Sequence, residues 1–230
     1  MPEITSPRKE RIREMQLISH SFKDGEPIPG EFAFAVIDPQ HHIALSANRN
    51  PHLMWSDVPP GTMSFALICH DYDVPVLVED VNKEGRSIPI SQPRDTFFHW
   101  ILVDLPANVR EIPAGSHSNG ITPHGKPGPE APQNALHGIN DYTKWFASDE
   151  NMKGAYHGYD GPCPPWNDLL IHHYVFTLFA LDVSHLEIKG EITGQSARSA
   201  LNGHVLGSAS LTGTYSLNPE VSQRTLDMRG

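Results

Sequence analysis

Carboxylates and a proline follow an apolar segment in the first third of the chain. Asp71, Asp73 and Pro75 come soon after the run 65–68. Residues two apart in an extended chain point to the same side, so both carboxylates could face one cavity. Acids in turns also hydrogen-bond to nearby backbone groups, and these two residues taken alone favour that simpler interpretation.

Imidazoles occur near the start of two other expected strands. His99 lies where an aromatic run becomes a strand, and a single histidine there is more often a core residue than a ligand-binding one. His172 and His173 precede Tyr174. Because neighbours on a strand point to opposite faces, we expect His172 on the side of Tyr174 and His173 on the other side.

A rigid turn precedes the second group of histidines. Gly161 and Pro162 open the proline-rich segment 161–165. The amide of Gly161 has no side chain over it, and the amides of such a turn can converge on an anion. The alternative is a surface turn made stiff for stability. Together with the acids and histidines, the turn indicates a pocket for a small polar ligand.

Catalytic chemistry has weaker support in the sequence. The chain holds 14 histidines, but no His-Glu-x-x-His or paired-cysteine spacing that would indicate a metal site. It has no Gly-x-Ser-x-Gly motif, and Cys163 has no identified base in its turn. We therefore expect no metal, no cofactor and no enzymatic activity. A hydrolase that uses the Asp and His residues is the alternative.

Length and composition favour one loop-rich β domain. The chain has 230 residues, 38% of them hydrophobic, with 21 prolines and 18 glycines. No stretch approaches the roughly 20 apolar residues of a membrane span. The N-terminus lacks the apolar core of a signal peptide, and nothing requires a disulfide between Cys69 and Cys163. These features predict a cytoplasmic protein.

Charge argues against nucleic acid and anionic membranes as partners. The formal net charge is −10 with histidine neutral. The basic residues between 8 and 13 alternate with glutamates, which is typical of a solvated helix face. A nucleic-acid-binding protein normally presents a basic surface. An anionic ligand would need local donors that overcome the overall field.

Apolar, β-branched and aromatic runs predict strands at 64–70, 97–105 and 174–182, with a closing strand at 208–215. A helix is expected from Thr193 to Gly203. The predicted organisation is an N-terminal extension (1–21) with a short helix, a single domain (22–216) and a loose polar tail (217–230). The section 114–161, rich in Gly, Pro, His and Asn, is long enough to suggest a functional loop.

An ordered series of motifs resembles a known family over Phe22 to Ser216. The series is Phe22 to Pro29, Leu53 to Thr62, Ser64 to Pro75, His99 to Pro106, Gly161 to Pro165, His172 to Tyr174, and Gly203 to Ser216. It is similar to the phosphatidylethanolamine-binding protein family, in its prokaryotic Raf kinase inhibitor-like branch. Tyr72 departs from the family's usual proline, and the loops 79–94 and 116–156 are long.

The resemblance implies a mainly β fold, a Greek-key β-sandwich with a few short peripheral helices. It also implies a small pocket for a phosphate-like anion or phosphorylated head group. By the same resemblance, Pro75 shapes the first loop and could follow a cis bond. The residues that it places around the ligand are Asp71, Asp73, Pro75, His99, Gly161, Pro162, His172 and Tyr174.

We therefore predict a non-enzymatic binding or regulatory protein with an anion pocket. The donors would be an imidazole, the Tyr174 hydroxyl and turn amides. A second interpretation is an inhibitor of a kinase or a protease that acts through the pocket rim. The sequence leaves the physiological ligand, the protein partner and a homodimer open.

Overall fold

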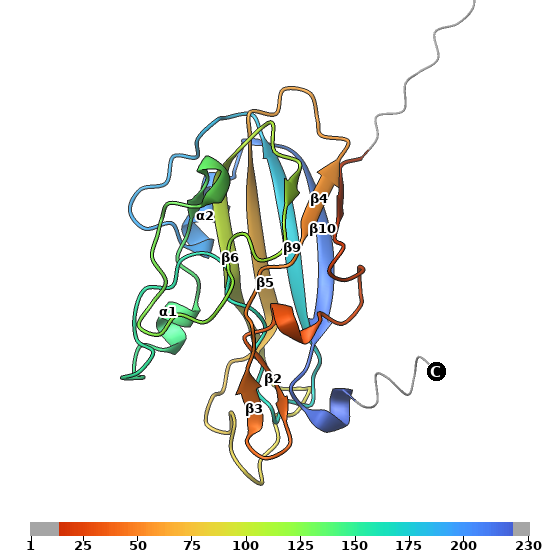
Figure 1. Ribbon diagram of the computed structural model, residues 1–230, viewed down its shortest axis with the longest axis vertical. Helices are drawn as coiled ribbons and strands as arrows, with labels where there is room; N and C mark the ends of the chain where they lie inside the picture. Colours follow the sequence, from red (N-terminus) through yellow and green to blue (C-terminus); the bar gives the residue numbers. More distant parts are fainter. Residues whose placement is uncertain (1–13, 223–230) are drawn as a thin grey trace, which may run out of the picture.

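Two antiparallel sheets packed face to face form the molecule (Figure 1). The computed structural model describes residues 14–222. The larger sheet has the order β10-β9-β5-β6-β8 and the smaller one β1-β4-β7, while β2 and β3 form a separate hairpin. The strands are β1 (Gln16–Ile18), β2 (Ala35–Asp38), β3 (His42–Leu45), β4 (Leu53–Ser56), β5 (Ser64–Pro75), β6 (Arg94–Pro106), β7 (Glu111–Ile112), β8 (Leu136–His137), β9 (His172–Leu181) and β10 (Val205–Tyr215).

Helices are short and peripheral. They are the 3-10 turns η1 (Gly30–Phe32) and η2 (Pro132–Asn134) and the α-helices α1 (Tyr142–Trp145) and α2 (Gly194–Ala200). Thr193 caps α2, accepting a hydrogen bond from the Ser196 amide, while the Ser196 hydroxyl accepts from the Thr193 amide. The expected β-sandwich with few short helices is confirmed. The expected helix 193–203 is shorter than predicted and ends before Gly203, whose φ is +84°.

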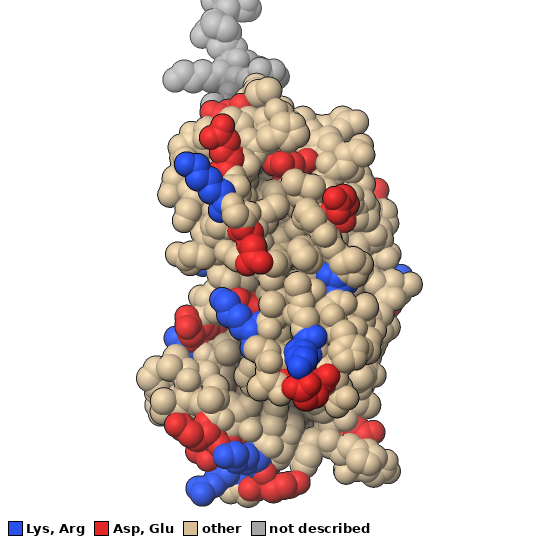
Figure 2. All heavy atoms as spheres, turned by 90° about the vertical axis from the view of Figure 1, so that its left-hand side faces the viewer, with Lys and Arg blue, Asp and Glu red and all other residues tan. Residues whose placement is uncertain are grey.

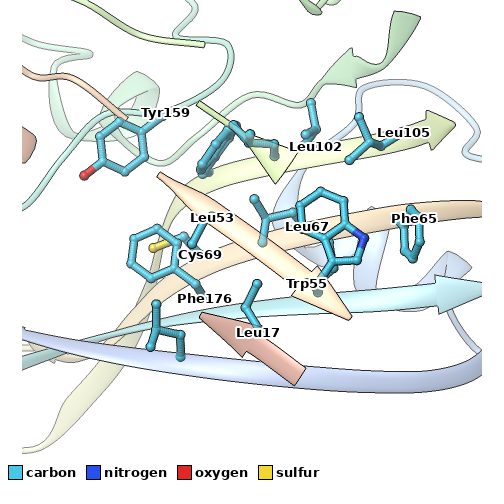
Figure 3. Packing of buried hydrophobic residues seen from close by; sticks show 14 of the residues in the cluster. Leu17, Leu53, Trp55, Phe65, Leu67, Cys69, Leu102, Leu105, Tyr159 and Phe176 are labelled. Carbon is cyan, nitrogen blue, oxygen red and sulfur yellow. The ribbon is translucent and has the colours of Figure 1, made fainter. Parts of the chain in front are cut away.

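The main core lies between the two sheets (Figure 3). Leu17, Leu53 and Trp55 of the small sheet face side chains of the large one, including Leu67 and Phe176. Strand β9 alternates buried and half-buried residues because one face packs in this core. Strand β5 is buried over most of its length because α2 and the segment before it cover its other face. That double burial explains the continuous apolar run near residues 65–68.

Several boundaries differ from the sequence-based expectations. The segment from Asp71 to Pro75 belongs to β5 rather than to a turn after it, although the register shifts between Asp71 and Val74. His99 lies inside β6, because that strand begins at Arg94. Both strands are longer than their apolar cores, since polar residues near their ends continue the ladder.

Both chain ends also differ from expectation. Gln16 belongs to a strand, so the short helix expected in the extension 1–21 does not include it. Residues 1–13 of that extension lie outside the described residues. The tail expected after residue 217 is packed as far as residue 222, since Leu217 and Asn218 are buried. Asn218 donates to the Asp168 carbonyl over 3.0 Å. Along the described chain the cis bond is Gly128–Pro129, so the bond before Pro75 is trans rather than the cis form that the resemblance allowed.

The long loop between β5 and β6 is fastened by one buried amide. The Asn167 side chain donates to the carbonyls of Asp80 and Arg86 and accepts from the Asn82 amide, at 2.8 to 3.1 Å. Ile88 of the same loop is fully buried. In Figure 1 this loop hangs from the same end of the sandwich as the β2–β3 hairpin. The loop is therefore held against the segment that precedes β9.

Truncation of the core is expected to be costly. Leu67 in β5 is fully buried, and it lies opposite Leu102 of β6 on one side and Leu178 of β9 on the other. We expect Leu67→Ala to lower the free energy of unfolding by about 2–5 kcal/mol, measured by urea denaturation. Leu45→Ala is the control, because Leu45 is 66% exposed. Equal losses in both variants would contradict this assignment of the core.

Candidate functional site

A buried chain of charged side chains joins three segments of the molecule. His172 Nδ1 lies 2.6 Å from Asp71 Oδ2, and His172 Nε2 lies 3.1 Å from Asp168 Oδ2. Asp168 also accepts two hydrogen bonds from the Arg94 guanidinium, at 2.5 and 3.1 Å. The side chains of His172, Asp71 and Asp168 are at most 2% exposed. We call these four residues the charged chain.

The carboxylates keep His172 protonated. Burial by itself lowers the pKa of this imidazole, but the charge of Asp71 and the hydrogen bonds to Asp168 and Asp71 raise it to about 9. Burial opposes the ionisation of Asp168, yet hydrogen bonds from His172 and Arg94 bring its pKa below the ordinary value. With a proton on each nitrogen, His172 donates to both carboxylates.

Asp73 belongs to a different pair from Asp71. Its Oδ2 accepts from the His173 amide at 2.9 Å and lies 2.8 Å from His173 Nδ1. The Tyr72 ring stacks on the His173 ring, with centroids 5.6 Å apart. The two carboxylates thus bond to different imidazoles, and the β5 ladder is irregular between Asp71 and Val74. The opposite orientations of His172 and His173 are as parity predicted.

His99 lies beside this cluster in its neutral form. Its Nδ1 donates to the Asp160 carbonyl over 2.8 Å, and burial lowers its pKa. The ring meets that of Tyr174 edge-on, with centroids 5.0 Å apart. In this tautomer Nε2 carries a lone pair. Nε2 has no hydrogen-bond partner in the described part of the chain, and it is not among the fully enclosed polar atoms.

Tyr174 connects His99 to the charged chain. It lies opposite Asp71 in the β5–β9 ladder, and its hydroxyl hydrogen-bonds to the Asp71 carboxylate. Burial, reinforced by the negative charge of Asp71, raises the pKa of the phenol well above its ordinary value. Tyr174 is therefore a neutral donor that is already engaged within the protein.

The turn amide at Gly161 is not open to a ligand. Its N–H donates to Asn48 Oδ1 over 2.8 Å, and its carbonyl accepts from the Tyr142 hydroxyl over 2.7 Å. A Cβ on Gly161 would lie 2.2 Å from the Phe32 carbonyl oxygen, so the close approach of backbone requires glycine here. The Pro162 carbonyl accepts from the Phe34 amide over 2.9 Å. The turn is thus a structural junction, and it is buried rather than the surface turn of the simpler interpretation.

A second buried network, centred on Asp160, adjoins this junction. Asp160 accepts from the side chains of Asn48 at 2.8 Å and Asn140 at 2.7 Å, and it forms an ion pair with Lys126 at 3.0 Å. The same residue presents its carbonyl to His99. The orientation of His99 therefore depends on residues from the long section 114–161, which sequence reasoning marked as functional without naming them.

The structure brings some expected site residues together and separates others. Asp71, His99, His172 and Tyr174 form one contiguous cluster, whereas Asp73, Gly161 and Pro162 bond elsewhere and Pro75 is a buried strand residue. Two surface hollows lie away from this cluster: one of about 450 Å³ beside Arg198 and Phe179, and one of about 420 Å³ at 115–122 and Lys126. Neither hollow is lined by any of the expected site residues.

Sequence reasoning missed Asp168 and Arg94. Asp168 stands four residues before His172, between the proline-rich segment 161–165 and β9. Arg94 is distant from Asp168 in sequence, and only the folded sheet brings the start of β6 near the segment that precedes β9. The one feature of the sequence that could have indicated Asp168 is a carboxylate placed shortly before a histidine at the start of a strand.

Metal and thiol chemistry have little support from the geometry. The described residues contain no group of three or more His, Cys, Asp or Glu side chains placed to hold a metal ion. Cys69 and Cys163 are both free thiols. Burial raises the pKa of Cys163 to about 12. At neutral pH this thiol is protonated and is a poor nucleophile.

Surface charge on one face and helix length are two further features of the described residues. On the face that carries α1 and α2, acidic and basic side chains are mixed, and no basic patch stands out (Figure 2). No helix of the described residues is long and apolar enough to cross a membrane. A β-sandwich with a polar cluster near one end of its strands is a common framework for a ligand-binding domain.

Comparison with known proteins assigns the family. A model described as phosphatidylethanolamine-binding protein matches residues 18–216. The chain is 30% identical to the UPF0098 protein YbhB of Escherichia coli K12, over 88% of this chain and 100% of that protein. It is also 30% identical to a UPF0098 protein of Aquifex aeolicus, over 87% and 88%. The chain therefore belongs to the phosphatidylethanolamine-binding protein family.

Solved structures agree with this assignment. The structure of Escherichia coli YbcL, described as a new member of the mammalian PEBP family, matches with a TM-score of 0.62 and 26% identity, covering 89% of this chain and 99% of that one. A putative phosphatidylethanolamine-binding protein homologue from Chlamydia trachomatis matches with a TM-score of 0.59 and 28% identity, covering 88% and 97%. The resemblance in the sequence is confirmed, and family membership supports a binding protein.

The raised pKa of His172 predicts how stability depends on pH. The folded value of about 9 exceeds the ordinary 6.5, so the contribution is complete below pH 6.5 and is lost as pH rises through 9. Denaturation between pH 6 and 9.5 should show a loss of roughly 3 kcal/mol that His172→Gln lacks. His41→Gln, at an 80% exposed side chain, should keep the wild-type profile. A wild-type profile in His172→Gln would refute the charged chain.

Proposed function

We propose that the chain is a non-enzymatic binding protein whose cluster around His99 accepts a small phosphate-like anion or a phosphorylated head group. The observation that carries the proposal is His99 itself. It is 4% exposed, held by the Asp160 carbonyl and the Tyr174 ring, and retains an Nε2 without a partner among the described residues. A buried imidazole with one unused nitrogen is suited to a specific polar contact.

The bonding pattern refines which form of the anion can bind. The nitrogens of His172, the Tyr174 hydroxyl and the Gly161 amide already have protein partners. Neutral His99 offers an acceptor, not a donor, so the ligand must bring a proton or His99 must gain one. A phosphate monoester, with a second pKa of about 6, can donate its own O–H as the monoanion. Binding is therefore favoured under acidic conditions.

A protein partner at the rim is the second candidate function. Tyr72, Val76, Leu77, Val78 and Ile90 are 45% to 62% exposed, and all lie in or beyond the final residues of β5. Exposed apolar residues grouped near a polar site commonly contact another protein. This supports an inhibitor of a kinase or a protease as the alternative. Loss of a captured partner in Leu77→Ser, with anion binding unchanged, would favour it.

Anion affinity should increase as pH falls. Calorimetry with inorganic phosphate and with sulfate, from about pH 8 to 5.5, separates two sources of the proton, because sulfate stays unprotonated in that range. The pKa of the His99 imidazole lies below 6.5 because the ring is buried. Stronger sulfate binding at low pH would indicate that His99 gains the proton. Stronger binding of phosphate alone would indicate the ligand's own proton.

Variants decide whether His99 is the contact. His99→Gln should weaken phosphate binding at pH 5.5 by about tenfold or more, the cost of one charge-assisted hydrogen bond. His173→Gln is the matched control, since His173 lies on the opposite side of β9. Affinity that is flat with pH, or equal in both variants, would rule out the proposed site.

We expect no catalytic turnover. His172 has both nitrogens engaged by carboxylates, so it offers no base, and the Cys163 thiol is protonated at neutral pH. Phosphate and carboxyl esters incubated with the dialysed protein should therefore hydrolyse at the background rate. Hydrolysis that disappears in both Asp73→Asn and His99→Gln, with the fold retained, would establish the enzyme alternative.

A further inference from the structure

We propose that the surface hollow of about 450 Å³ beside α2 binds a small monocarboxylate with a short apolar body, whose carboxylate pairs with Arg198. The hollow lies where the chain leaves α2 and enters β10, on the face of the large sheet that α2 covers. Its size is within the range of ligand pockets, roughly 300–1,000 Å³. The residues that line it are Phe179, Arg198, Leu201, Asn202, Gly203 and Val205. None of them belongs to the cluster around His99, so the inference is independent of the function proposed above.

The Arg198 guanidinium has no oxygen partner in the described part of the chain. No hydrogen bond or ion pair joins its N–H groups to any of residues 14–222. The other arginines in that range all have an oxygen partner: Arg49 pairs with Glu31, Arg86 with Asp80 and Arg94 with Asp168, and Arg110 donates to the carbonyls of Ala107 and Val109. A guanidinium carries five N–H donors, and those of Arg198 therefore remain for a ligand.

The guanidinium is also oriented in advance. It lies over the Phe98 ring, 4.6 Å from the ring centroid, and Phe98 is itself only 8% exposed. A guanidinium stacked on an aromatic ring keeps the edge that bears its donors free. Partial burial lowers the pKa of Arg198, although the group stays charged at neutral pH. A cation that is already placed and partly stripped of water loses less on binding an anion.

The charges around the hollow favour an anion. No carboxylate is among its lining residues, although the chain has a formal charge of −10. Asp182, at the adjoining end of β9, lies 2.9 Å from His204 Nδ1. The hollow at 115–122 differs in this respect, because the ammonium of its Lys126 is already paired with Asp160.

The walls of the hollow select a carboxylate with an apolar body. Phe179, Leu201 and Val205 supply apolar surface, and the Asn202 amide supplies a second polar group. The guanidinium fork matches the planar carboxylate, which can accept two parallel hydrogen bonds from it. Inorganic phosphate would pair with Arg198 but would leave the apolar walls uncovered. A short aliphatic monocarboxylate uses both kinds of surface.

The test is a titration of the full chain with hexanoate and with 1-hexanol, a neutral ligand of the same length, at neutral pH. Calorimetry should show saturable hexanoate binding that is at least about tenfold tighter than binding of 1-hexanol, because only the carboxylate pairs with Arg198. In NMR spectra the amide signals of Asn202 and Gly203 should shift, because both residues line the hollow.

Variants of the polar residues separate charge pairing from apolar contact. Arg198→Gln should lower hexanoate affinity by at least about tenfold and leave 1-hexanol binding unchanged. Arg86→Gln is the matched control, because it removes the same charge from a 67% exposed side chain outside the hollow. Asn202→Asp keeps the guanidinium but adds a carboxylate to the same hollow, so it should also weaken hexanoate binding.

Several outcomes would overturn the proposal. An arginine in the last turn of α2 that served only the helix dipole would lower the free energy of unfolding when replaced by glutamine, and hexanoate binding would stay unchanged. Equal affinity for hexanoate and 1-hexanol would show apolar contact without charge pairing. Hexanoate that fails to saturate at millimolar concentration, or that shifts signals around His99 instead of the hollow, would also contradict it.

Discussion

The ion pair between His172 and its two carboxylates sets the arrangement of this end of the sandwich. Asp71 reaches His172 from β5, Asp168 reaches it from the segment before β9, and Arg94 closes the series from the start of β6. Removing water from isolated charges is costly, and mutual pairing with good hydrogen-bond geometry offsets that cost. The strand ends must therefore stay in register, because a displaced strand would leave a buried charge without its partner.

This internal pairing also shapes the chemistry offered to a ligand. Groups that look like convenient donors in the sequence are used within the protein: the His172 ring by carboxylates, the Gly161 amide by Asn48, the Tyr174 hydroxyl by Asp71. What remains in the cluster, among the described residues, is the lone pair of His99 Nε2. The cluster thus presents acceptors more readily than donors.

Local patterns predicted the framework well, and contacts distant in sequence were the part that they could not predict. Apolar runs located β5, β6, β9 and β10, because each strand packs a regular face in a core. Parity separated His172 from His173 correctly. Parity could not predict that Asp71 and Asp73 bond to different imidazoles, since an irregular ladder has no signature in composition. The Arg94–Asp168 pair was missed for a similar reason, because two segments meet only after the sheet has formed.

Asn167 has a consequence for how the loop between β5 and β6 can diversify. Its side chain holds carbonyls of Asp80 and Arg86, and its neighbour in sequence is Asp168. The Asn167 side chain thus bonds to the loop near its middle and makes no hydrogen bond to the exposed residues 76–78. Relatives could carry other side chains at 76–78 without disturbing the hydrogen bonds of Asn167. A graft of a foreign recognition peptide at 76–78 would inherit a preformed base, so the scaffold is suited to engineering at this position.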